Sequence, residues 1–141
     1  MGLVVPNAGE LQLLDKMLKD ALSTDEAYIL KLYKISYQPI KTSSSGNFTE
    51  ATFTNYAART LTRAGWGAAS TVSDKASGTY GTVQSWTCGA TGNTVHGYYM
   101  VPAATAATTL WAEKFTTARV LASGDVLNIT PKFTLASETS N

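Results

Sequence analysis

The last third of the chain alternates between apolar and polar residues with the two-residue period of a β-strand. In residues 126–135 one face carries Leu127, Ile129, Phe133 and Leu135, and the other carries Asn128, Thr130, Lys132 and Thr134. Two strand-like runs precede this segment, at residues 94–101 and 109–115. The pattern predicts three consecutive strands of a half-buried antiparallel sheet. Pro131 predicts an edge or a bulge in the last strand, because proline cannot donate to a ladder.

Further strand patterns precede this region, at residues 27–33, 58–63 and 79–88, whereas residues 70–78 are polar and are expected to form a loop. Six or seven strands separated by turn residues favour an antiparallel β-sandwich, jelly-roll-like, over a βαβ sheet. The length of 141 residues suits one structural domain. We therefore expect a mainly β fold in which residues 27–141 form the sandwich and residues 1–26 form an N-terminal arm and helix.

The predicted helix follows a capping signal. Asn7 can cap it, Glu10 can reach back to the cap amide, and leucines then recur at helical spacing, at Leu11, Leu14, Leu18 and Leu22. A helix of about fifteen residues is marginal in isolation, so its leucine stripe must be buried. The stripe packs either across the end of its own sandwich or against a partner. Ahead of the helix lies the apolar arm 1–6, in which exposed Leu3, Val4 and Val5 would favour aggregation unless they pair with a sheet edge or another subunit.

Charge is low and scattered. The net charge is +1, and charged residues make up 15% of the chain, against about 25% in an average protein. Without a basic cluster, nucleic-acid binding is not expected. No apolar run is long enough for a membrane span, and no signal peptide is recognised. A surface poor in charge suits a protein that lies against neighbours, although a Thr-rich sheet surface on a monomer has the same composition.

The inventory of catalytic side chains is small. The chain has one histidine, His96, and one cysteine, Cys88, which is expected to be a small buried hydrophobe. Glu113 on the neighbouring strand could orient His96, but such pairs often arise by chance. The other carboxylates are dispersed, and no metal-ligand spacing or phosphate-binding glycine loop is present. We therefore expect no enzyme activity, no catalytic residues, no metal site and no cofactor.

Aromatic residues offer one binding hypothesis. Tyr98 and Tyr99 are consecutive, so one ring of a half-buried strand must point outward. With Trp86 or Trp111 it could form a platform that stacks on sugars, or an anchor covered by another subunit. Trp66, between two glycines, could fill the core or a binding site, and the core is favoured.

Several segments together resemble a known group of proteins. They are Val4-Val5-Pro6-Asn7-x-Gly9-Glu10, Leu30-x-Leu32-Tyr33 before Pro39, Phe48-Thr49-Glu50-Ala51-Thr52-Phe53-x-x-Tyr56, Val95-x-Gly97-Tyr98, Leu110-Trp111-Ala112-Glu113-x-Phe115 and Gly124-Asp125-x-Leu127-x-Ile129-x-Pro131. In this order, over nearly the whole chain, they resemble small virion proteins of tailed bacteriophages, of the capsid decoration or cement type.

The resemblance implies a jelly-roll-like β-sandwich on the capsid surface of a virion. Its partner would be the major capsid protein, whose subunits it would clamp together, commonly as a homotrimer. No catalytic residues are implied. The candidate interface consists of Leu3, Val4, Val5, Pro6, Leu11, Leu14, Tyr98 and Tyr99. The alternative function is a glycan- or receptor-binding module of a phage head or tail fibre, with a host-surface glycan as its ligand.

Overall fold

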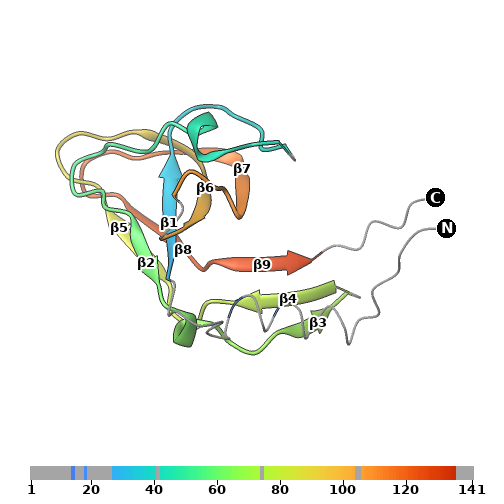
Figure 1. Ribbon diagram of the computed structural model, residues 1–141. Coiled ribbons are helices and arrows are strands. Elements are labelled where there is room, and N and C mark those ends of the chain that lie inside the picture. The colour runs from blue at the N-terminus through green and yellow to red at the C-terminus, as the bar shows by residue number, and fades with distance from the viewer. Residues whose placement is uncertain are drawn as a thin grey trace. The chain divides into compact units, whose positions relative to one another are not determined.

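The computed structural model describes Leu14, Leu18 and residues 27–40, 42–73, 75–103 and 106–135. These residues form a mainly β fold of antiparallel sheets (Figure 1), as the alternation predicts. The chain divides into two compact units. One consists of Met1–Asp25, Thr62–Val83 and Thr130–Asn141, and the other of Glu26–Leu61 and Gln84–Ile129.

A four-stranded sheet forms the larger part of the second unit. Its strands are β1 (Tyr28–Tyr33), β2 (Arg59–Leu61), β6 (Thr94–Pro102) and β7 (Trp111–Val120), in the order β2-β1-β6-β7. β1 and β6 lie side by side at its centre (Figure 1). Residues 97–102 of β6 are all buried. A continuous apolar run such as Tyr98–Val101 is typical of a strand that is covered on both faces.

An aromatic cluster covers one face of this sheet. Tyr33, Phe48, Tyr99 and Val101 form its core, and Tyr37 packs against it. The ring of Phe48 stacks on that of Tyr99, with centroids 4.6 Å apart and planes 11° apart. Phe48 follows the short 3-10 helix η1 (Ser45–Asn47), so the long connection between β1 and β2 supplies the cover.

The expectation that one of the two consecutive tyrosines points outward is wrong. Tyr98 is 4% exposed and Tyr99 is 3% exposed. Successive side chains of a strand do point to opposite faces, but here both faces are covered. The loop that carries Phe48 covers the Tyr99 face, which the alternation within β6 could not reveal.

Two further strands of the second unit pair with each other. They are β5 (Gln84–Thr87) and β8 (Val126–Ile129). Trp86 and Leu127 lie directly opposite each other and both are buried. The indole nitrogen of Trp86 donates to the carbonyl of Ala57 at 2.7 Å. Cys88, just after β5, is a buried free thiol, as expected from the sequence.

The single strand predicted for residues 126–135 is wrong in its extent. β8 ends at Ile129, and β9 (Lys132–Leu135) belongs to a different sheet. The buried residue Pro131 lies between them and has no amide hydrogen for a ladder bond. The alternation itself is confirmed in β8, where Leu127 and Ile129 are buried while Val126 and Asn128 are exposed.

In the first unit, β3 (Ser70–Val72), β4 (Lys75–Thr79) and β9 form a sheet in the order β3-β4-β9. The loop predicted for residues 70–78 is therefore wrong, as is the continuous strand predicted for residues 79–88, because β4 ends at Thr79 and β5 begins at Gln84. The strand β4 is difficult to predict because its residues are small or polar. Ala76, Ser77 and Gly78 are buried although they are small or polar.

Of the predicted N-terminal helix, only Leu14 and Leu18 are among the described residues. Both are in helical conformation and buried, at 0% and 1% exposure. A Cβ atom at Gly78 would meet Leu18 Cδ1 at 2.5 Å and Leu14 Cδ2 at 3.8 Å. The two leucines therefore pack against β4, and Gly78 leaves room for them. The remainder of the helix lies outside the described residues.

Trp66 also belongs to the core of the first unit, as the sequence favoured. It follows the short 3-10 helix η2 (Arg63–Gly65) and is 2% exposed. Its backbone forms a β-bridge with Tyr80, and the two rings make an edge-to-face contact with centroids 5.4 Å apart. The ring of Tyr80 occupies the space that a side chain at Gly65 would need.

Candidate functional site

Within the described residues, β7 pairs with β6 alone, and the register of this pairing shifts at His96. Val95 pairs with Arg119, and Gly97 pairs with Lys114, so the single residue His96 faces four residues of β7, 115–118. A bulge of this kind leaves the extra residues unpaired and increases the local twist. The middle of β7, residues 115–118, therefore has no paired residue in β6.

A cleft of about 940 Å³ lies beside this bulge. It is lined by residues 113 and 115–121 on the β7 side and by residues 125–129 on the β8 side. All of these residues belong to the second unit. β7 and β8 follow each other in the chain, joined by a short turn in which the Asp125 amide donates to the Ala122 carbonyl at 3.0 Å. They nevertheless pair with different strands, β7 with β6 and β8 with β5, so the two do not form a hairpin with each other.

Both walls of the cleft are strand edges. The Cys88 amide donates to the Asp125 carbonyl at 2.8 Å. Because bonded and non-bonded pairs alternate in an antiparallel ladder, Leu127 and Ile129 bond to β5, whereas Val126 and Asn128 direct their backbone groups away from it. The Leu121 amide donates to the Asn93 carbonyl at 2.9 Å, so Val120 likewise directs its backbone groups away from β6.

Two of the three charged side chains that line the cleft, Glu113 and Asp125, have structural partners, whereas the third, Arg119, is exposed. The Asp125 carboxylate accepts the Ala122 amide at 2.8 Å, which closes the turn before β8. The Glu113 carboxylate accepts the Tyr98 hydroxyl at 2.6 Å. Burial, and then this hydrogen bond and the charge of Glu113, raise the pKa of Tyr98, so the phenol stays protonated and remains the donor. The arrangement can hold an extended backbone, but these two carboxylates are already occupied.

Few of the residues singled out from the sequence lie in this cleft. Tyr98, Tyr99 and Trp86 are buried in the second unit, and Trp111 is half-buried in an edge-to-face contact with Tyr28. Leu14 is buried, while Leu3, Val4, Val5, Pro6 and Leu11 lie outside the described residues. The sequence placed the end of the second strand at Phe115, but β7 continues to Val120. The Thr-Thr-Ala run at 116–118, which breaks the alternation inside a strand, was the available signal for the bulge.

His96 is half-buried and faces the bulge of β7. Glu113 lies opposite Tyr98 and bonds to it, so it does not serve as the orienting partner of His96. Within the described residues, no group of three or more His, Cys, Asp or Glu side chains is placed to hold a metal ion.

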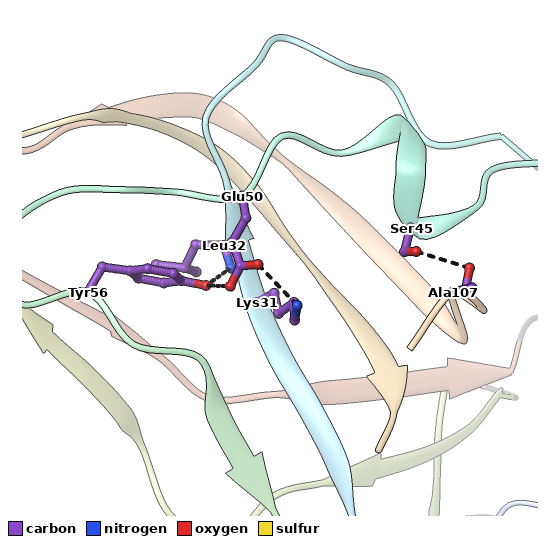
Figure 2. A network of polar contacts seen from close by, with 6 residues as sticks. All are labelled: Lys31, Leu32, Ser45, Glu50, Tyr56 and Ala107. Carbon is purple, nitrogen blue, oxygen red and sulfur yellow. Dashed lines mark hydrogen bonds and ion pairs between the residues drawn. The ribbon is translucent and has the colours of Figure 1, made fainter. Parts of the chain in front are cut away.

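A second polar network fastens the long connection after β1 to that strand. Glu50 lies between two partners: it accepts the Tyr56 hydroxyl at 2.9 Å and pairs with the Lys31 ammonium at 3.0 Å (Figure 2). The Tyr56 hydroxyl in turn accepts the Leu32 amide at 3.1 Å. Nearby, the Ser45 hydroxyl donates to the Ala107 carbonyl at 3.0 Å (Figure 2). Since these groups satisfy one another, the network positions the loop that carries Phe48.

No protein-family model, curated protein or solved structure matches this chain. In the part of the chain that the structure describes, no helix has the length and apolar character needed to cross a membrane.

The buried tyrosines predict a loss of stability in alkali. Burial, and then the charge of Glu113, raise the pKa of Tyr33 to about 12, and burial, then the charge of Glu50, raise that of Tyr99 to about 12. Above the ordinary value of 10.0, the unfolded chain loses protons that the folded chain retains. The stability that these two tyrosines contribute should therefore be fully present below pH 10, and it should be lost as the pH rises from 10 to 12. Thermal melts at intervals from pH 8 to pH 12 would measure this, and an unchanged melting temperature above pH 10 would contradict it.

Proposed function

We propose that this chain is a structural virion protein that binds the outer surface of a phage capsid and stabilises contacts between major capsid subunits. It acts as a homo-oligomer, with a trimer favoured, and needs no cofactor or catalytic residue. Its fold in this proposal is a jelly-roll-like β-sandwich with the N-terminal helix packed on it. The observation that carries the proposal is the cleft between the β7 and β8 edges, because an open pair of strand edges is a means of joining protein chains.

Composition supports this role. Charged residues are 15% of the chain, and interface cores are depleted in charge. Many copies on a symmetric shell bind with avidity, so each contact can be weak. A capsid-stabilising protein needs protein-binding surfaces and does not need catalytic residues.

In this proposal the predicted helix and the arm ahead of it have different roles, because Leu14 and Leu18 of the helix are buried. These leucines pack against β4, which supports a helix docked on its own chain. Leu14 then stabilises the fold, whereas Leu3, Val4, Val5 and Pro6 remain the candidates for contact with a neighbour. Leu11 stays a candidate on the same segment. Tyr98 and Tyr99 support the sheet from within.

The glycan-binding alternative has weaker support. Three of its four rings, those of Tyr98, Tyr99 and Trp86, are buried, and Trp111 is half-buried. A stacking platform needs a ring face that a sugar can reach. A glycan array probed with the purified protein tests this alternative. Strong binding to selected glycans would support it.

Cryo-electron microscopy of the phage particle tests the leading proposal. We expect density for this protein on the outside of the shell, repeated at the quasi-threefold axes between major capsid subunits. Particles without the protein should lose that density and should break at a lower temperature or lower osmotic stress. Density confined to the tail would rule out the capsid role.

A further inference from the structure

We propose that the cleft between β7 and β8 binds an extended strand, and that the occupant is the arm Gly2–Pro6 of a second copy of this chain. The inference rests on the proposed homo-oligomer and names the contact that holds it together. The arm would add a strand to each of the two open edges, so that the apolar arm and the unpaired edges are buried in one step.

The cleft has the dimensions of a peptide site. Its volume of about 940 Å³ lies near the upper end of the range of about 300–1,000 Å³ found for ligand sites. β8 has four residues, Val126–Ile129, which at about 3.4 Å per residue offer about 14 Å of edge. A strand of four residues matches this length. Val126 and Asn128 supply the amide and carbonyl groups, because their bonding direction is away from β5.

The middle of the cleft favours an uncharged occupant, because the charged residues of the lining, Glu113, Arg119 and Asp125, lie toward its two ends. The stretch of β7 that β6 leaves unpaired, residues 115–118, is Phe-Thr-Thr-Ala, and β8 is Val-Leu-Asn-Ile. Natural proteins protect exposed edges with lysine, proline or inward-pointing charge. Neither stretch contains any of these. The exposed side chains Val120 and Val126, 75% and 53% exposed, extend the apolar surface at the turn end of the cleft.

Of the two ends of the chain outside the described residues, the arm is the better match. Residues 2–6 are Gly-Leu-Val-Val-Pro, with no charge and with β-branched valines that favour strands. Pro6 cannot donate to a ladder and would end the added strand there. Residues 136–141, Ala-Ser-Glu-Thr-Ser-Asn, are polar and include a carboxylate. Such a segment has no large apolar side chain to bury in the cleft.

The direction of the added strand is restricted. β8 reverses the direction of β7 after the turn at residues 122–125. An inserted strand would therefore run antiparallel to one wall and parallel to the other, as in a mixed sheet. Pairing with both walls satisfies the backbone groups of the arm on its two sides.

Disulfide trapping between two differently tagged full-length chains tests the proposal. One chain carries Val4→Cys and the other carries Asn128→Cys, and Cys88 stays in place because it is buried. After mixing and mild oxidation, we expect the mixed disulfide dimer as the main product. The matched control replaces Asn128→Cys by Thr60→Cys, an exposed position on β2, the edge strand at the other side of the four-stranded sheet. The Asn128 pair should crosslink about tenfold more than the control, since only it brings the thiols into persistent contact.

Two results would overturn the proposal. One is equal crosslinking of Val4→Cys to Asn128→Cys and to Thr60→Cys. The other is a disulfide within one chain when Val4→Cys and Asn128→Cys are combined, because the arm would then occupy its own cleft. Excess synthetic peptide of residues 2–7 should suppress the mixed dimer, which separates binding in the cleft from random collision.

Hydrogen exchange on the unmodified protein gives a second measurement that does not depend on the cysteine variants. The amides of Val126 and Asn128 should exchange about tenfold or more slowly in the oligomer than in the Val4→Asp variant, because the arm accepts or shields them. Equal exchange rates would refute an added strand. If the cleft fails these tests while the particle still shows capsid density, the proposed function stands and only this contact is wrong.

Discussion

Replacing Trp86 with alanine should lower the free energy of unfolding by about 3–5 kcal/mol, as large-to-small substitutions of buried aromatic residues do. Trp86 is 1% exposed and lies opposite Leu127 in the β5–β8 pair. The guanidinium of Arg59 lies 5.4 Å from the centre of its ring. Among the described residues Trp86 is the largest fully buried side chain, so the substitution would leave a cavity. Denaturant unfolding followed by circular dichroism measures the loss.

Two controls separate cavity formation from other effects. Trp86→Phe keeps much of the apolar volume but leaves the Ala57 carbonyl without its 2.7 Å partner, so it should cost about 1–3 kcal/mol. Val120→Ala removes an apolar side chain that is 75% exposed and should change stability by less than about 0.5 kcal/mol. A loss below about 1 kcal/mol for Trp86→Ala would show that β5 does not pack as described.

Gly92→Ala should destabilise the protein by about 2–4 kcal/mol, because the added methyl group overlaps backbone that cannot rotate away. A Cβ atom at Gly92 would collide with the carbonyl oxygen of Leu121. The Leu121 amide donates to the Asn93 carbonyl at 2.9 Å, and this bond closes the end of the β6–β7 pair. Relieving the collision would therefore open the ladder at the turn end of the cleft.

Gly46→Ala is the matched control for this substitution. It lies in η1, and the nearest atom to its added Cβ is Ser44 Oγ at 3.8 Å, which is ordinary contact. We expect no loss of stability, since alanine also lowers the entropy of the unfolded chain. Thermal melts of both variants give the comparison. Equal melting temperatures for Gly92→Ala and Gly46→Ala would contradict the close approach of residues 92 and 121.

The parts of the fold that could be predicted are those that bury one face of a strand. β1 and the alternation of β8 followed from Leu30, Leu32, Leu127 and Ile129, since the two-residue period directs these side chains to one side. β3 and β4 were missed because their buried positions are filled by small residues such as Ser77 and Gly78. Gly78 is small because Leu14 and Leu18 pack over it, which is a contact between distant parts of the chain.

The candidate cleft could not be predicted, because pairing partners decide it. Consecutive strands joined by a short turn usually pair with each other, yet β7 pairs with β6 and β8 pairs with β5. The edges of β7 and β8 are separated because β7 has a bulge at residues 115–118 and because β8 pairs with β5. The sequence carries no local signal for the β5–β8 pairing, and its only local signal for the bulge is the break in alternation at Thr116 and Thr117.

Composition and residue period, which need no knowledge of contacts, are enough to predict a mainly β, charge-poor chain with an apolar arm, one histidine and one cysteine. Tertiary contacts are needed to explain why Tyr98 and Tyr99 are both buried and why Pro131 lies between strands of two sheets. They also explain why, within the described residues, β7 and β8 each keep one unpaired edge. These outcomes depend on which segments, far apart in the chain, meet in space. Burial of a sheet face by a distant loop, and ladder bonds between strands that are not consecutive in the chain, leave no mark in local periodicity.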